Sequence, residues 1–169
     1  SFFLRGQPVI YYGDEQGFAG SGGDQASRQS MFASKVAAYN AESLVATSAT
    51  TARDNYDTTH PIFRALAEMA AIRTAEPALR RGDEVVRLTG DGPGLFAVSR
   101  RVPGSNAEVL VVFNTDRKPH AAGVEVSASA AGFVSLHGAC PKAPFAPGAA
   151  KIEAPPLSYI VCKTTIAAP

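Results

Sequence analysis

The chain has 169 residues, of which 46% are hydrophobic, enough to build a core and to exclude global disorder. Its formal net charge of +1 gives no electrostatic reason to bind nucleic acid or an anionic membrane. No apolar run approaches the roughly 18 residues that span a bilayer. From the charge and the run lengths together, we expect no nucleic-acid partner and no membrane partner.

The first apolar run occupies residues 8–12 (PVIYY) and is continuous rather than alternating. Such a run is typical of a strand buried on both faces, as in a parallel sheet covered by helices. Gly13 ends the run, and two adjacent acids follow it. One parallel strand cannot form a sheet, so the pattern predicts further strands outside this chain. The first residues include neither an initiator Met nor a signal sequence, which also indicates a piece of a longer protein.

Loop and helix signals follow this run. The glycine-rich stretch 17–23 predicts a loop. Apolar residues near helical spacing over 27–39 predict a helix, with Asp24 just before it as an N-terminal cap. Pro61 suits the first turn of a second helix, which Pro77 limits. The apolar stripe of this second helix consists of Ile62, Phe63, Leu66, Met69, Ala70 and Ile72.

Short alternating runs separated by turn residues fill the chain after Gly82. They predict an antiparallel sandwich, because several short strands at this spacing are typical of that architecture. The expected strands are residues 84–88, 95–101, 108–114, 123–127, 133–137, 151–154 and 158–163. We therefore place a domain boundary between residues 82 and 83.

Two cysteines, Cys140 and Cys162, lie in the sandwich half of the chain. If they pair, they close a loop whose entropy term is worth about 3 kcal/mol. Such a bridge would favour an oxidising compartment. Two buried free thiols fit the sequence equally well, so both alternatives stay open. The spacing of the Cys and His residues does not resemble a zinc site, and we expect no metal ligand in this chain.

Four stretches together resemble glycoside hydrolase family 13, the alpha-amylase family: RGQPVIYYGDEQGFAG, GGDQASRQSMF, HPIFRALAEMAAIRTAEPALRRG and APPLSYIVCK. In that family the first is the eighth strand of a TIM barrel, the second carries a D-x-x-x-R element and the third is the last barrel helix. The resemblance implies an α/β plus all-β fold. Residues 1–82 would be the last strand and helices of a (β/α)8 barrel, and residues 83–169 an antiparallel Greek-key β-sandwich, domain C.

The resemblance also implies a function. The chain would be the C-terminal part of a glycoside hydrolase that acts on α-glucans such as starch and maltooligosaccharides with retention. The family's three catalytic acids lie on earlier barrel strands, so we expect no catalytic residue in this chain and no activity from it alone. An α-glucan transglycosylase and a trehalose-forming isomerase share the scaffold and remain alternatives. A purely structural or carbohydrate-binding role for the β domain also remains open.

The family also implies partners and a location. We expect the partners to be an α-glucan and the remainder of the barrel. No cofactor is expected in this chain, while calcium in the full-length enzyme is compatible with the family. A secreted or periplasmic location is expected, and a cytoplasmic one is not excluded.

The resemblance assigns site residues as well. Asp24 and Arg28 match the D-x-x-x-R element, which implies substrate binding, since a carboxylate accepts from sugar hydroxyls and a guanidinium donates to them. The same spacing suits an i,i+4 ion pair that only caps a helix. Tyr12, Gly13 and Glu15 are expected to support the barrel rim. Neighbouring residues of an extended chain point in opposite directions, so Glu15 and the acid before it are not expected to form a catalytic pair.

Overall fold

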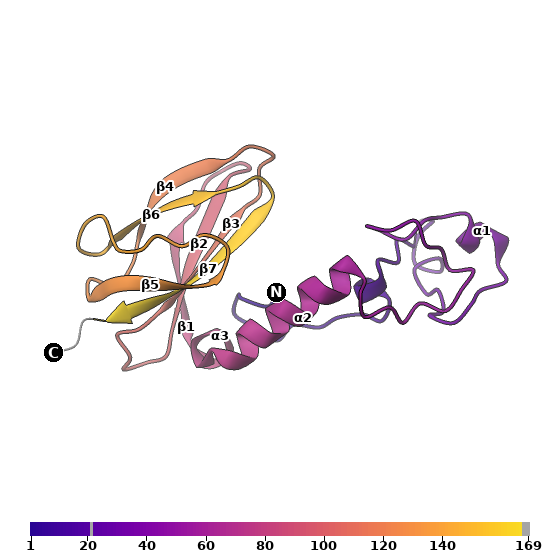
Figure 1. Ribbon diagram of the computed structural model, residues 1–169, viewed down its shortest axis with the longest axis horizontal. Helices are drawn as coiled ribbons and strands as arrows, with labels where there is room; N and C mark the ends of the chain where they lie inside the picture. Colours follow the sequence, from indigo (N-terminus) through magenta and orange to yellow (C-terminus); the bar gives the residue numbers. More distant parts are fainter. Residues whose placement is uncertain (21, 167–169) are drawn as a thin grey trace. The chain divides into compact units, whose positions relative to one another are not determined.

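The computed structural model describes residues 1–20 and 22–166, and the chain forms two compact units (Figure 1). The β unit contains residues 1–6 together with residues 72 onward, and the loop unit contains residues 7–71. Ser21, in the expected glycine-rich loop, and residues 167–169 lie outside the described residues.

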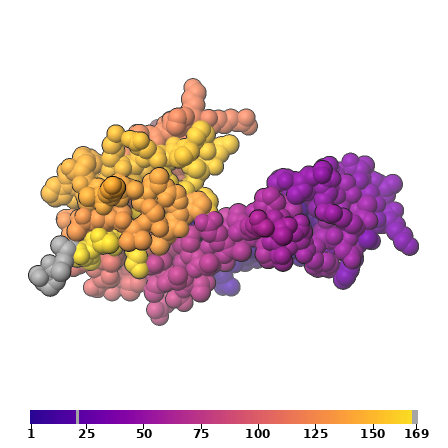
Figure 2. Space-filling model, viewed as in Figure 1, coloured from indigo at the N-terminus to yellow at the C-terminus, as the bar shows by residue number. Residues whose placement is uncertain are grey.

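Antiparallel strands build the β unit. They are β1 (Asp83–Leu88), β2 (Leu95–Arg101), β3 (Val109–Asn114), β4 (His120–Glu125), β5 (Ala130–His137), β6 (Ala149–Ala154) and β7 (Ser158–Ile166). One sheet has the order β1-β2-β3-β7-β5, and β4 pairs with β6 in a second sheet. In the space-filling view these strands, coloured pink to yellow, close into one compact body (Figure 2). The prediction of an antiparallel sandwich is confirmed, with each expected strand present.

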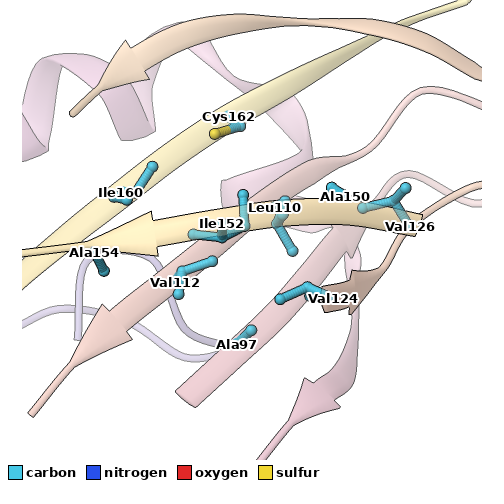
Figure 3. Packing of buried hydrophobic residues seen from close by; sticks show 10 residues of the cluster. All are labelled: Ala97, Leu110, Val112, Val124, Val126, Ala150, Ile152, Ala154, Ile160 and Cys162. Carbon is cyan, nitrogen blue, oxygen red and sulfur yellow. The ribbon is translucent and has the colours of Figure 1, made fainter. Parts of the chain in front are cut away.

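An apolar core lies between the two sheets (Figure 3). The larger sheet contributes Leu110, Val112 and Ile160, and the smaller sheet contributes Val124 and Ile152, each at most 1% exposed. Alternate residues of a strand share a face, which is why positions 110 and 112 point into the same core. Full burial of one such side chain is worth about 1.5–3 kcal/mol. The other members of the cluster are Ala97, Val126, Ala150, Ala154 and Cys162.

Two helices directly precede the sandwich, and the sequence predicted the first of them. Helix α2 (Pro61–Ala75) begins at the expected proline, and His60 Nδ1 accepts the Ile62 N–H at 3.2 Å just before it. Helix α3 (Pro77–Arg81) follows and buries Leu79 completely. None of the residues of α2 is fully buried, and its apolar stripe is only half-buried within the described chain. No described helix is both long enough and apolar enough to cross a membrane.

Two arginines hold the first six residues in the β unit. Arg100 of β2, 2% exposed, donates to the Phe3 carbonyl at 2.9 Å. Arg73 of α2 donates to the carbonyls of Phe2 and Gly6 at 2.6 and 2.7 Å. Burial lowers the pKa of the Arg100 guanidinium. The N-terminal segment is therefore part of this unit, although residues 7–71 separate it from the rest in sequence.

A buried carboxylate joins several strands of the sandwich. Glu108, just before β3 and 1% exposed, accepts the Ser127 N–H at 2.6 Å and lies 3.3 Å from Arg87 Nη2. Arg87 of β1 also donates to Ser99 of β2 at 2.9 Å and to Glu125 of β4 at 2.8 Å. This network links both sheets through side chains, because Glu108 and Arg87 together reach both.

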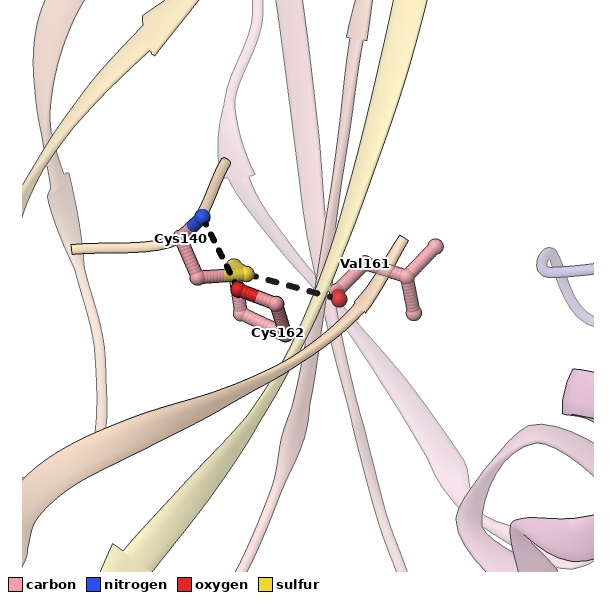
Figure 4. Close-up of a disulfide and its surroundings, with 4 residues drawn as sticks. Cys140, Val161 and Cys162 are labelled. Atoms are coloured by element: carbon pink, nitrogen blue, oxygen red, sulfur yellow. Dashed lines mark hydrogen bonds between the residues drawn. A yellow bond between two sulfur atoms is a disulfide. The ribbon is translucent and has the colours of Figure 1, made fainter. Parts of the chain in front are cut away.

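Cys140 and Cys162 form a disulfide (Figure 4). Cys162 lies buried on β7, and Cys140 lies in the loop after β5. The Cys140 N–H donates to Ser135 Oγ at 3.2 Å. Cys140 Sγ is also 3.5 Å from the Val161 carbonyl oxygen. A disulfide sulfur carries no proton, so this is a packing contact. Of the two alternatives that the sequence left open, the structure contains the bridge.

An ion pair in the connection between β3 and β4 predicts a pH dependence. Asp116 Oδ2 accepts from His120 Nε2 at 2.7 Å, and this hydrogen bond lowers the pKa of Asp116 from its ordinary value of 3.8. The unfolded state therefore binds the proton at higher pH than the folded state. The stabilisation is complete above the unfolded pKa and is lost as pH falls through the lowered one.

We expect Asp116→Asn to lower the free energy of unfolding above about pH 5, where the parent chain has the full stabilisation, and to flatten its fall below about pH 4, where the two chains converge. Urea denaturation at a series of pH values measures this. The exposed Asp91 provides the control variant Asp91→Asn. An acid limb of equal slope in both variants and in the parent chain would contradict the assignment.

Residues 8–12 correct one prediction, because they are neither a strand nor buried. The exposed fractions are 81% for Val9, 42% for Ile10, 50% for Tyr11 and 45% for Tyr12. A strand needs a neighbour to pair its N–H and C=O groups, and the described residues of the loop unit contain no strand. The apolar pattern is strand-like, but no strand lies beside it.

The helix expected over residues 27–39 is also wrong, apart from the short α1 (Ala37–Asn40). Serine side chains capture the backbone instead: Ser30 Oγ accepts the Phe32 N–H and Ser34 Oγ accepts the Val36 N–H, each at 3.1 Å. Such local bonds compete with helical ones. Apolar spacing predicted a helix, and local serine chemistry prevailed.

Candidate functional site

A tight turn follows the apolar run of the loop unit. Gly13 has φ 92°, and a Cβ there would lie 2.7 Å from a ring carbon of Phe18, so the turn requires glycine. The short 3-10 helix η1 (Asp14–Gln16) follows. Glu15 Oε2 accepts the Gly13 N–H at 2.9 Å, and Asp14 Oδ2 accepts the Tyr11 N–H at 3.1 Å. Both carboxylates therefore hold the backbone of the turn.

Gln16 anchors this turn to a distant part of the loop unit. Its side chain, in a residue 2% exposed, accepts the Asp57 N–H at 2.9 Å and donates to the Asp57 carbonyl at 3.1 Å. Asp57 Oδ1 in turn accepts the hydroxyl and the N–H of Thr59 at 2.6 and 2.7 Å, and these bonds lower the pKa of Asp57. Sequence reasoning missed this anchor, since the two residues lie 41 positions apart.

The structure brings Asp24 and Arg28 together. Arg28 Nη2 lies 2.8 Å from Asp24 Oδ2, and the side chains are 58% and 73% exposed for Arg28 and Asp24 respectively. No described helix begins at this point, so the pair does not cap a helix. The pair sits in a turn, where Ser27 Oγ donates to the Asp24 carbonyl at 2.8 Å. Two hydrogen-bonding groups of opposite charge are thus accessible to a ligand.

Arg28 lies at a hollow of about 360 Å³ on the loop unit. The lining residues are Tyr12, Arg28, Ser30, Met31, Phe32 and Tyr56. The volume falls within the usual range of small-molecule sites, roughly 300–1,000 Å³. The rings of Phe32 and Tyr56 meet edge to face with centroids 5.4 Å apart. A hydrogen bond with Tyr11 raises the pKa of Tyr12, and Arg28 opposes that shift.

Sequence reasoning found part of this hollow. Tyr12 and Arg28 were expected at the rim and in the site, and both line the hollow. Phe32 and Tyr56 were missed. No short motif connects the two missed rings, because residues 33–55 lie between them. An accessible arginine–carboxylate pair next to aromatic rings is chemically suited to a ligand with both hydroxyl groups and apolar faces.

The described residues contain no cluster of three or more His, Cys, Asp or Glu side chains arranged to hold a metal ion. The three histidines have structural surroundings instead. His60 caps α2, His120 pairs with Asp116, and the His137 ring stacks on Tyr159 with centroids 3.9 Å apart. We assign no chemistry to them.

The sequence is similar to amylases. The chain is 44% identical over 128 residues to an alpha-amylase of Streptomyces lividans. This alignment covers 76% of the chain and 13% of that protein. It is 26% identical over 107 residues to a beta/alpha-amylase of Paenibacillus polymyxa, with 63% of the chain and 7% of that protein covered. The chain thus spans about an eighth or less of the length of these curated relatives. No protein-family model matches it.

Solved structures show the same relationship at the level of fold. A cyclomaltodextrinase aligns with 97% of the chain and 24% of its own length, at a TM-score of 0.64 and 19% identity. A variant of AmyP in complex with maltotriose aligns with 70% of the chain and 23% of its own length, at a TM-score of 0.55 and 13% identity. The mostly antiparallel architecture of the chain therefore aligns to part of amylase structures. The chain is related to the alpha-amylase family, glycoside hydrolase family 13, and covers a small part of that family's proteins.

Proposed function

We propose that the chain is the C-terminal part of an α-amylase-type glycoside hydrolase that acts on starch and maltooligosaccharides with retention. Residues 1–82 supply the last strand and helices of its barrel, and residues 83–169 are its domain C. The nucleophile, the general acid/base and the third catalytic acid lie outside this chain. This chain contributes substrate binding through Asp24 and Arg28.

The Asp24–Arg28 pair is the observation that carries the proposal. The two groups are 2.8 Å apart and more than half exposed, and Arg28 lines a hollow that can admit a ligand. A carboxylate accepts hydrogen bonds from two sugar hydroxyls, and a guanidinium held by that carboxylate donates to others. The structure of AmyP with maltotriose shows that a protein of similar fold binds such a sugar.

The exposed surface of the loop unit supports the proposal that residues 8–12 are one strand of a larger sheet. Leu44 is the one hydrophobic side chain counted as core among its described residues, while the strand-like residues 8–12 are largely exposed. Neighbouring barrel strands would supply the backbone partners that this run lacks. The coverage of 13% of an amylase leaves ample chain for those strands.

A structural role for the β unit fits its aromatic residues. Tyr159, its one tyrosine, packs against His137 at 3.9 Å and Phe3 at 5.5 Å between ring centroids. The ring is therefore engaged in internal contacts. The chain has no tryptophan, the other residue suited to a surface platform for sugars. We propose that this unit shields the barrel and does not bind starch itself.

The disulfide supports a secreted or periplasmic location, because such bridges persist in oxidising compartments. Calcium, if the full-length enzyme uses it, would be held by residues outside this chain.

Substitution of the pair tests the proposal in the full-length enzyme. We expect Asp24→Asn and Arg28→Ala each to raise KM for maltoheptaose about tenfold or more, because a hydrogen bond to a charged group is worth about 1.5–3 kcal/mol. Initial-rate kinetics measure KM, and nuclear magnetic resonance of the first-formed anomer tests retention.

The ion pair of Lys151 and Glu153 provides the control, since its length of 2.9 Å and its exposure of 64% and 70% match those of the site pair. Glu153→Gln should leave KM unchanged. An enzyme that does not cleave α-glucans would overturn the proposal, and so would Asp24 and Arg28 variants with the parent KM.

A further inference from the structure

Phe32 and Tyr56 form an exposed aromatic corner that no catalytic or folding role so far explains. Their exposed fractions are 65% and 54%, although both side chains are large and apolar enough to favour burial. They approach to 5.4 Å between ring centroids and line the same hollow as Arg28. Exposed apolar groups that gather at one hollow mark a binding site more often than scattered ones do.

The backbone holds the two rings in place. Met31 precedes Phe32 and Asn55 precedes Tyr56. These two neighbours are joined to each other, because the Asn55 N–H donates to the Met31 carbonyl at 2.8 Å. The Ala33 N–H next to Phe32 donates to Asp54 Oδ1 at 2.8 Å. Asn55 itself is 3% exposed. The corner is therefore preorganised, which lowers the entropy lost when a ligand binds.

The charged neighbours favour a sugar over a protein surface as the occupant. Arg28, which lines the hollow with the rings, is 58% exposed, and its partner Asp24 is 73% exposed. A protein surface that covered the rings would also remove water from this ion pair, and the desolvation can exceed the Coulombic gain. A glucose residue has C–H groups on its ring faces and hydroxyls around its edge. It can lie on the rings while its hydroxyls keep both charged groups hydrogen-bonded.

We propose that Phe32 and Tyr56 are an aromatic platform for a glucose residue of the α-glucan, next to the residue bound by Asp24 and Arg28. This inference rests on the proposed function and extends its site by one sugar. Such a platform makes affinity depend on chain length, because only an oligosaccharide that extends beyond the residue bound by Asp24 and Arg28 gains the contact with the rings. Phe32 and Tyr56 are thus specificity-determining residues for long substrates.

The test compares KM values of the full-length enzyme for maltoheptaose and maltotriose. We expect Phe32→Ala and Tyr56→Ala each to raise KM for maltoheptaose about tenfold, with kcat and KM for maltotriose within about twofold of the parent. Phe32→Tyr and Tyr56→Phe keep a ring and should restore the parent KM. Phe145→Ala is the matched control, since Phe145 is 64% exposed and lies in the β unit.

Each outcome decides the matter. A parent enzyme active on maltoheptaose whose alanine variants keep its KM within twofold overturns the platform and leaves the proposed function standing. A parent enzyme inactive on every α-glucan overturns the proposed function first. Equal KM increases for both sugars also overturn the platform, since they indicate a general disturbance of the site. If an alanine variant shows no melting transition, Phe32→Leu and Tyr56→Leu, which keep apolar volume without a ring, take its place.

Discussion

Glu108→Ala is expected to lower the free energy of unfolding of the β unit by about 1–3 kcal/mol, because it leaves a buried backbone donor without its acceptor and removes one of the two carboxylates that pair with Arg87. Glu108 is 1% exposed, and its carboxylate accepts the Ser127 N–H at 2.6 Å beside Arg87. The variant leaves that N–H without its acceptor inside the sandwich. Urea denaturation followed by circular dichroism at neutral pH measures the loss.

A surface glutamate provides the comparison. Glu153 is 70% exposed and pairs with Lys151 at 2.9 Å on β6. Exposed pairs contribute about 0–1 kcal/mol, so Glu153→Ala should change the free energy of unfolding by less than about 1 kcal/mol. Equal losses in the two variants would show that burial of Glu108 does not decide its contribution.

Loss of the disulfide is expected to destabilise the β unit by about 3 kcal/mol. The bridge joins residues 22 positions apart, and the closed loop restricts the unfolded chain by an entropy term of that size. The double variant Cys140→Ala, Cys162→Ala removes the bridge. Its midpoint of thermal unfolding should fall by several degrees relative to the oxidised parent, as measured by calorimetry.

Reductant separates the bridge from the packing of the two side chains. Dithiothreitol should lower the midpoint of the parent and leave that of the double variant unchanged. A parent chain whose midpoint is the same with and without reductant would contradict a stabilising bridge.

The sandwich could be predicted from sequence because its signals are local. Alternation along β2 predicts a strand without knowledge of its neighbours, although the structure buries Ala97 and Val98, on opposite faces, completely. Glycine and proline clusters mark the turns between strands. The bounds of the predicted and observed strands differ by a few residues at their ends, where pairing depends on the partner strand.

The loop unit was harder to predict because its structure depends on partners and on side-chain bonds. Residues 8–12 have the composition of a buried strand, yet strand formation requires a neighbour that composition cannot supply. In residues 27–39, hydroxyls of Ser30 and Ser34 bind nearby N–H groups and prevent the helix that apolar spacing favours. Local pattern and local chemistry disagreed, and only the three-dimensional structure shows which one prevailed.

The candidate site divides in the same way. Asp24 and Arg28 could be found because a four-residue spacing is visible in the sequence, although the alternative of a helix cap needed the structure to weaken it. Phe32 and Tyr56 could not be found, since their contact depends on a backbone hydrogen bond between two segments far apart in sequence, from Asn55 to Met31. Two aromatic residues so far apart look unrelated until the backbone brings them together.

The arginine contacts with the first six residues have a consequence for protein engineering. Arg100 and Arg73 bind the carbonyls of Phe3, Phe2 and Gly6, and the Arg5 N–H donates to Glu84 at 2.6 Å. The β module is therefore split in sequence, and a gene fragment that starts at residue 72 would encode it without one of its own pieces. The missing hexapeptide would be a ligand for that truncated module. A transferable version of the β unit should carry both segments, joined by a new linker in place of the loop unit.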